Sequence, residues 1–199
     1  MHILVNAASA NMGGSVTYLQ NVLRWLPILA PKDLFTVYVP TATKEKLEHL
    51  GKDNVQLVAY PYSDTGGARR VYFDQVYLPQ QVRRKGIDLL FSTTGFGTFF
   101  SPCPEILLVR NIAYFDAAFH RKYRELGRSL RKNTIRRWHS LLSISRADTV
   151  LFPTEGMKPA VVELHLDVDD REPDQHAAFQ RLLEALVDGG DVLARDVAA

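Results

Sequence analysis

The stretch that decides the fold is the N-terminal one, which reads MHILVNAASANMGGSVTYLQNVLRWL over residues 1–26. Residues 3–5 form a short, wholly apolar run, which is typical of a strand buried on both faces of a parallel sheet. Two glycines at 13 and 14 then interrupt the chain, and apolar residues recur at helical spacing at 16, 19, 22, 23 and 26. A strand, a glycine turn and an amphipathic helix in this order predict the start of a βαβ unit.

The same alternation continues along the chain. Aliphatic, β-branched and aromatic runs predict further strands at 35–39, 55–58, 87–91, 105–109 and 149–152. Helices are expected at 43–50, 69–84, 115–144 and 154–166, and Gly51 and Gly86 are expected to end the first two of these. On the helix at 69–84, the positions expected to be buried are Val71, Phe73, Val76 and Tyr77. We therefore expect an α/β fold, a Rossmann-like parallel sheet with helices on both faces.

Charge divides the chain into two parts. Residues 161–199 hold ten acidic and three basic residues, a net charge of −7, so residues 1–160 carry +9 of the overall +2. The acidic stretch at 167–172 is typical of a linker, and the apolar positions of 173–187 predict an amphipathic helix. We therefore expect one domain at 1–166, followed by an acidic linker and helical tail at 167–199.

Composition narrows the class of protein. With 199 residues, 46% of them hydrophobic and 23% charged, the chain matches globular proteins and not disordered or collagen-like ones. The one cysteine, Cys103, excludes an intramolecular disulfide, and the six histidines show no metal-ligand spacing, so we expect no metal site. No export signal or membrane-spanning run is visible, which predicts a cytoplasmic protein, with peripheral contact to a membrane left open.

The glycine turn at residues 11–15 is the first candidate site. Gly13 and Gly14 allow close approach to the backbone, and the following helix offers free N–H groups and the positive end of its dipole. Together with Ser15 they form a candidate phosphate site, although a tight turn that only needs small residues explains them equally well. The motif is not G-x-G-x-x-G, so a dinucleotide cofactor is not supported.

Two other segments follow predicted strands and should face the same crevice. These are the loop at 92–97, which contains Thr94, and the pair Arg110 and Asn111. Ligands of open α/β sheets bind at the carboxyl ends of the strands. Hydroxyl, guanidinium and amide groups there can orient a polyhydroxyl substrate by hydrogen bonds, and ordinary loop chemistry is the competing interpretation.

A basic region at 120–139 is the third feature. Apolar residues alternate there with eight arginines and lysines that face a single acid, Glu125. Such a helix can be a solvated surface, can lie on an anionic membrane or acceptor, or can bind nucleic acid, the interpretation we favour least. The candidate anion-binding residues are Arg121, Lys122, Arg124, Arg128, Arg131 and Lys132.

Two patterns are discounted, and no catalytic residue is assigned. Asp167 and Asp169 resemble a pair that binds a metal–diphosphate, but no strand precedes them to position them. Glu155 and Glu163 have the spacing of a two-glutamate motif, but they fall on a different helix from the expected one. Cys103 lies between two prolines and is not expected to be a nucleophile.

Taken in order, these segments resemble family 4 retaining glycosyltransferases of the GT-B fold. The matching pieces are MHILVN and GGSVTY at 1–6 and 13–18, DLLFS at 88–92, LVRN at 108–111 and SRADTVLFPTEGMK at 145–158. The last piece is the most specific, and the resemblance covers roughly residues 1 to 165.

The resemblance implies the acceptor-side domain of an enzyme that transfers a sugar from a nucleotide-sugar to an acceptor, with retention at the anomeric carbon. The glycine loop matching Gly13 and Gly14 would approach the donor diphosphate. The pair at Arg110 and Asn111 is often His-Asp in the family, so the role of that histidine does not carry over. Beyond the nucleotide-sugar co-substrate, no cofactor and no metal is implied.

Length is the largest departure from that family, whose members have a second domain that holds the nucleotide-sugar. Only 33 residues follow Leu166, too few for such a domain. We expect half of an enzyme, either truncated or completed by another chain, that does not transfer sugar alone. The alternative is a non-catalytic Rossmann-like module that binds an anionic partner or membrane surface through its basic helix.

Overall fold

The computed structural model describes residues 1–11, 13–60, 67–111, 114–115, 121, 131–154, 157 and 161. Within them, one sheet of six strands forms the centre of the molecule, in the order β3-β2-β1-β4-β5-β6. All neighbouring strands pair in parallel, as the sequence predicts. The strands are β1 (His2–Asn6), β2 (Leu34–Val39), β3 (Val55–Ala59), β4 (Leu89–Ser92), β5 (Glu105–Leu108) and β6 (Thr149–Leu151).

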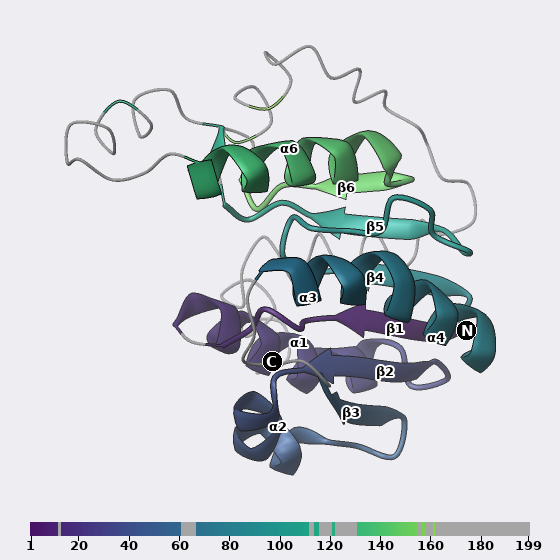
Figure 1. Cartoon of the computed structure of the whole chain (residues 1–199). Coiled ribbons are helices and arrows are strands. Elements are labelled where there is room, and N and C mark those ends of the chain that lie inside the picture. The colour runs from purple at the N-terminus through teal and green to yellow at the C-terminus, as the bar shows by residue number, and fades with distance from the viewer. Residues whose placement is uncertain are drawn as a thin grey trace.

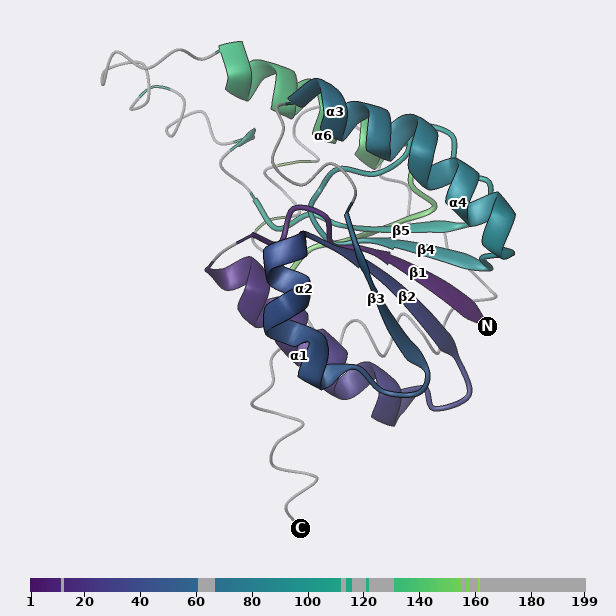
Figure 2. The ribbon, with the colours of Figure 1, turned by 60° about the horizontal axis from the view of Figure 1, so that its bottom comes forward.

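Helices cover both faces of the sheet, as Figures 1 and 2 show. One face carries α1 (Gly14–Leu29) and α2 (Thr41–Leu47), which a 3₁₀ turn, η1 (Glu48–Leu50), extends. The other face carries α3 (Gly67–Tyr72), the π-helical segment η2 (Phe73–Tyr77), α4 (Leu78–Lys85) and α6 (Arg131–Arg146). The predicted α/β fold with helices on both faces is therefore confirmed.

The core explains why the strands read as continuous apolar runs. Along β1, Ile3 and Val5 pack into the cluster that contains Leu19 and Leu23 of α1. Leu4, between them, faces the other way and packs into the cluster that contains Leu78 of α4. Because both faces of the strand are covered, every side chain of residues 3–5 is fully buried.

The strand order places a switch point beside β1. The chain runs outward from β1 to β2 and β3, then returns to form β4 on the other side of β1. The loops after β1 and β4 therefore leave the sheet in opposite directions, and in open α/β sheets such a point opens a crevice for ligands. The carboxyl ends of β1, β4 and β5 form the edge at which the predicted site lies.

Two expectations about the helix at 69–84 are wrong. Val71 and Val76 are exposed, whereas Phe73 is buried together with Asp74. The cause is η2, because a π turn holds more residues than an α turn and rotates the positions around it. Gly86 ends α4 in the left-handed conformation as predicted, with φ 59° and ψ 50°.

Gly51 ends the helical segment as predicted, but by a different geometry from that of Gly86. Gly51 has φ −59° and not the left-handed conformation, because the 3₁₀ turn η1 ends there with a bond from the Gly51 N–H to the Glu48 carbonyl. Pro27 lies inside α1, which continues to Leu29. Most of the helix expected at 154–166 and the whole tail at 167–199 lie outside the described residues, so the domain boundary stays a prediction.

Candidate functional site

The carboxyl edge of the sheet joins two of the predicted segments directly. The Arg110 side chain follows β5 and reaches across to the start of α1, where its Nη2 donates a hydrogen bond of 3.0 Å to the Gly14 carbonyl. The Arg110 guanidinium carbon also lies 4.4 Å from the centre of the Tyr18 ring. Residues 96 positions apart in the sequence thus share one surface.

The start of α1 has the features of an anion site. Gly13 adopts φ 59° and ψ −143°, a conformation that other residues rarely adopt. No side chain caps the helix at Gly13, and no acidic residue lies in its first turn. An ideal Cβ on Gly13 would meet nothing within 4 Å, so conformation and not crowding requires this glycine.

Arg110 makes this end of α1 strongly positive. Its side chain is half-buried, and burial lowers its pKa, while the neighbouring Tyr18 acts in the opposite direction. The ion pairs found among the described residues join Met1, Lys44 and Arg70 to acids, and Arg110 is in none of them. A cation beside the positive end of a helix dipole is unfavourable by itself, so the pair attracts an anion.

The loop after β4 comes to the same edge. The backbone N–H and the hydroxyl of Thr93 both donate to the Asn6 carbonyl at the end of β1, at 3.1 and 3.0 Å. Gly95, with φ 71°, lies against the end of β5, since a Cβ there would be 3.8 Å from the Val109 Cα. Residues 93–95 therefore bridge the ends of β1 and β5.

Two buried hydroxyls at this edge have no hydrogen-bond partner among the described residues, those of Tyr18 and Thr94. Burial raises the pKa of Tyr18, so its hydroxyl keeps its proton and can donate. Buried polar groups are normally hydrogen-bonded, so both are free to bond to a ligand or to water. Thr94 is a predicted site residue, whereas nothing in the sequence pattern singled out Tyr18.

Glu105, at the start of β5, carries a buried carboxyl that contacts the loop after β4. No sequence pattern singled out this residue. It accepts hydrogen bonds from the Ser92 hydroxyl at 2.6 Å and from the backbone N–H and hydroxyl of Thr98. An ideal Cβ on Gly97 would lie 2.5 Å from its Oε1, so any larger residue there would displace the Glu105 carboxyl from its hydrogen bonds. Burial, opposed by these hydrogen bonds, raises the pKa of Glu105 to about 7.

The sequence pattern also did not indicate a network of polar side chains that lies at the end of β1. The buried Asp74 carboxylate accepts from the Asn6 amide at 3.1 Å and from the Arg70 Nε at 2.6 Å. Arg70 also donates to the Ser9 hydroxyl in the loop after β1. The spacing of Arg70 and Asp74, four residues apart, is typical of an ion pair on a helix surface. In the structure the π-helical segment η2 rotates the pair toward the sheet, so the pair is largely buried.

Gln75 and His139 hold the loop after β4 from the outer side. Gln75 donates from Nε2 to the Gly97 carbonyl at 3.0 Å and accepts from the Phe99 N–H at 2.8 Å. His139 of α6 lies against the rings of Phe96 and Phe99, and its Nε2 is 3.4 Å from that of Gln75. Burial lowers the pKa of His139, which favours the neutral imidazole.

The structure thus brings Gly13, Gly14, Ser15 and Arg110 to one surface, with Thr94 in the adjoining loop. Asn111 follows Arg110 and is exposed. Of the predicted basic residues, Arg121 is helical and exposed, and Lys122, Arg124 and Arg128 lie outside the described residues. Arg131 and Lys132 begin α6, but their side chains are outside the description.

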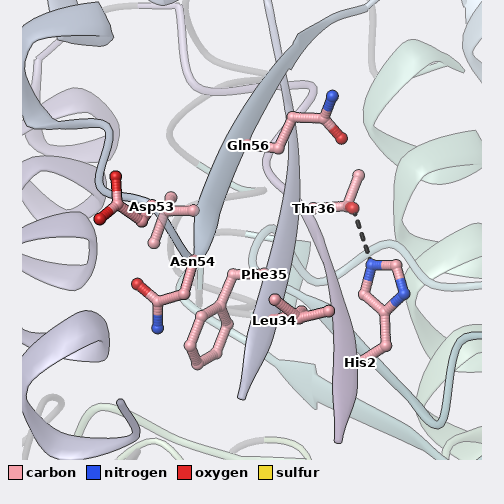
Figure 3. A pocket seen from close by; sticks show the side chains of 8 residues that line it. His2, Leu34, Phe35, Thr36, Asp53, Asn54 and Gln56 are labelled. Atoms are coloured by element: carbon pink, nitrogen blue, oxygen red, sulfur yellow. Dashed lines mark hydrogen bonds between the residues drawn. The ribbon is translucent and has the colours of Figure 1, made fainter. Parts of the chain in front are cut away.

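A pocket of about 460 Å³ lies elsewhere, at the amino ends of β1, β2 and β3 (Figure 3). In it the His2 ring and the Thr36 hydroxyl are hydrogen-bonded at 2.9 Å. No predicted site residue lines this pocket, which is at the opposite end of the strands from Arg110.

Three further features bear on metal binding, thiol reactivity and membrane insertion. In the part of the chain that the structure describes, no three His, Cys, Asp or Glu side chains come together so as to hold a metal ion. Burial raises the pKa of Cys103 to about 11, so this thiol stays protonated near neutral pH. None of the described helices combines the length and the apolarity that a bilayer crossing needs.

Comparisons with known proteins found little. The chain matches no protein-family model and no curated protein sequence. Among solved structures it is similar to E. coli heptosyltransferase WaaC with ADP, at a TM-score of 0.40 and 11% identity. The match covers 92% of this chain but only 53% of that one, so this chain spans about half the length of the heptosyltransferase.

Proposed function

We propose that this chain forms the acceptor-side domain of a retaining glycosyltransferase of family 4, which uses a nucleotide-sugar as donor. The start of α1 and Arg110 would lie against the donor diphosphate. The resemblance of residues 1–165 to that family motivates the proposal, and one structural observation carries it. This observation is the bond from Arg110 to the Gly14 carbonyl, which holds a cation at the positive end of α1.

The chemistry expected of this surface is electrostatic. When a sugar leaves a nucleoside diphosphate, negative charge develops on the departing phosphate oxygens. Fixed N–H dipoles and a cation placed there stabilise that charge without reorganising, which is the general device of oxyanion stabilisation. The Arg110 guanidinium supplies the cation, and the unpartnered hydroxyls of Tyr18 and Thr94 supply donors for diphosphate or sugar oxygens.

Arg110 stands where the family often has histidine, so we assign it to diphosphate binding and not to placement of the transferred sugar. A guanidinium presents several donors in a fixed plane and remains charged even when burial lowers its pKa. The proposal leaves the donor nucleotide, the sugar and the acceptor open. It also assigns the greater part of nucleotide recognition to a second domain, supplied by the same or another chain.

The binding test uses Arg110→Gln and inorganic pyrophosphate or ADP as the probe. We expect the variant to bind the probe at least about tenfold more weakly, because a hydrogen bond to a charged group contributes about 1.5–3 kcal/mol. Isothermal titration calorimetry on the 199-residue chain measures this. Arg84→Gln is the matched control, since Arg84 is exposed at the end of α4, at the opposite end of the strands. Equal affinity of wild type and Arg110→Gln would overturn the assignment.

Activity is a separate prediction. The 199-residue chain is expected to bind diphosphate without transferring sugar. The reason is that the proposed second domain, which would hold the nucleotide-sugar, is not part of the described domain. The measurement is release of nucleoside diphosphate from a panel of nucleotide-sugars with simple acceptors. Turnover by the purified chain would show that the described domain needs no second one.

A further inference from the structure

The outward side of α6 carries an apolar stripe. Ile135, Trp138 and Leu142 are 60%, 69% and 41% exposed, and their spacing of three and four residues places them on one side of the helix. The inward side of the same helix carries Ser140, Ser143 and Ile144, which are all buried. The stripe is therefore not part of the core.

Apolar residues of neighbouring elements extend this stripe. Figures 1 and 2 both show α3 on the same face of the sheet as α6, and Gln75 of η2, which continues α3, contacts His139 of α6. Tyr72 and Val76 are exposed on α3 and η2, and Phe100 is 76% exposed, with the Arg146 guanidinium 5.4 Å from its ring. We call the surface formed by α3, η2, α4, α6 and Phe100 the outer helical face.

The charge of the outer helical face has one sign. Residues 67–86 and 134–146 contain eight arginines and lysines and a single acid, Asp74. Asp74 is buried and paired with Arg70, so it does not offset the charge at the surface. Large exposed apolar groups between basic residues are unusual on a monomer and indicate an interaction surface.

We propose that the outer helical face docks on an anionic lipid bilayer, with Trp138 and Ile135 entering the headgroup region. Basic side chains gain energy near an anionic leaflet, and tryptophan and aliphatic side chains gain energy in the interfacial layer. Ile135, Leu142 and Val76 offer nothing to nucleic acid phosphates, which favours lipid over nucleic acid. This inference is independent of the proposed sugar transfer.

The residues proposed to dock differ from those that the sequence pattern indicates. The sequence pattern pointed to basic residues between 121 and 132, whereas the described exposed stripe runs from Ile135 to Leu142. The proposal also adds α3, which no sequence pattern connected with α6. The two helices share one face because α6, which lies between β5 and β6 in the chain, packs on the same side of the sheet as α3.

The test is flotation of the full chain with vesicles of phosphatidylcholine alone or with 30% phosphatidylglycerol. We expect binding only to the anionic vesicles. The variant Arg136→Gln/Arg146→Gln should bind about thirtyfold more weakly, since each basic residue near an anionic surface contributes about 1 kcal/mol. The matched control is Arg24→Gln/Lys46→Gln, which removes the same charge from exposed positions of α1 and α2 on the other face. It should bind within about twofold of the wild type, because those residues would face away from the bilayer.

Tryptophan fluorescence gives a readout at the residue itself. In a Trp25→Phe background, Trp138 is the sole tryptophan, and its emission should shift to the blue on anionic vesicles. Ile135→Gln/Trp138→Gln, at two exposed positions, should abolish flotation while far-UV circular dichroism stays unchanged. Equal binding to neutral vesicles, an unshifted Trp138, or a shift with a single-stranded oligonucleotide but not with vesicles would each overturn the proposal.

Discussion

Replacing Asp74 with alanine is expected to cost about 3–5 kcal/mol of the free energy of unfolding, because it leaves a largely buried guanidinium without its counter-ion. The Asp74 carboxylate is fully buried and accepts from both Asn6 and Arg70. The Arg70 side chain is only 17% exposed, so water cannot replace the lost partner fully. Urea denaturation followed by circular dichroism measures the change.

Two further variants separate charge from packing. Asp53→Ala changes an exposed aspartate and should leave stability within about 0.5 kcal/mol of the wild type. Arg70→Met/Asp74→Leu removes both charges and should recover much of the loss, because the stability cost comes from the unpaired charge and not from the absent pair. A loss below about 1 kcal/mol in Asp74→Ala would show that the network contributes little.

The second large effect concerns pH and Glu105. The folded chain raises the pKa of this carboxyl from its ordinary 4.5 to about 7, chiefly by burial. An acid whose pKa is raised on folding stabilises the fold below its unfolded pKa, and this stabilisation is lost as pH rises through the folded pKa. The gap corresponds to about 3 kcal/mol, so this contribution should be present at pH 4.5 and absent above pH 8.

Glu105→Gln isolates this effect. The amide remains neutral, so the variant should lose the part of the pH dependence that lies between pH 4.5 and pH 8. The half-buried His139 acts in the opposite direction, since its lowered pKa weakens the fold as pH falls below its unfolded value near 6.5. The quantity to measure is therefore the difference between the two unfolding curves across pH. A difference that does not change with pH would mean that Glu105 titrates normally in the fold.

The chain order of strands and helices could be predicted because it rests on local pattern. A strand covered on both faces must be apolar at every position. Residues 3–5 and 89–91 are apolar throughout, and all of them are buried. The position of the candidate site followed from the same pattern, because residues just after parallel strands must lie at one edge of the sheet. The pattern therefore predicts that Gly14 and Arg110 lie at the same edge, and the structure joins them by a hydrogen bond.

Reasoning from periodicity failed at η2. Helical spacing predicted that Val71 and Val76 face inward, but the π turn exposes both and buries Asp74. The extra residue in a π turn leaves no mark in the pattern of apolar positions. The ion pair of Arg70 and Asp74 has a spacing that most helices place on the surface, so its burial could not be predicted either.

The amino-acid sequence by itself determined the α/β class, the parallel sheet and the edge of the sheet where the candidate site lies, since these depend on periodicities within a few residues. Only the tertiary structure decided which side chains meet there. The Arg110 bond to Gly14 spans 96 residues, and the Asn6 bond to Asp74 spans 68. Such contacts depend on strand order and helix rotation, which arise from packing the whole sheet and are not carried by any local pattern.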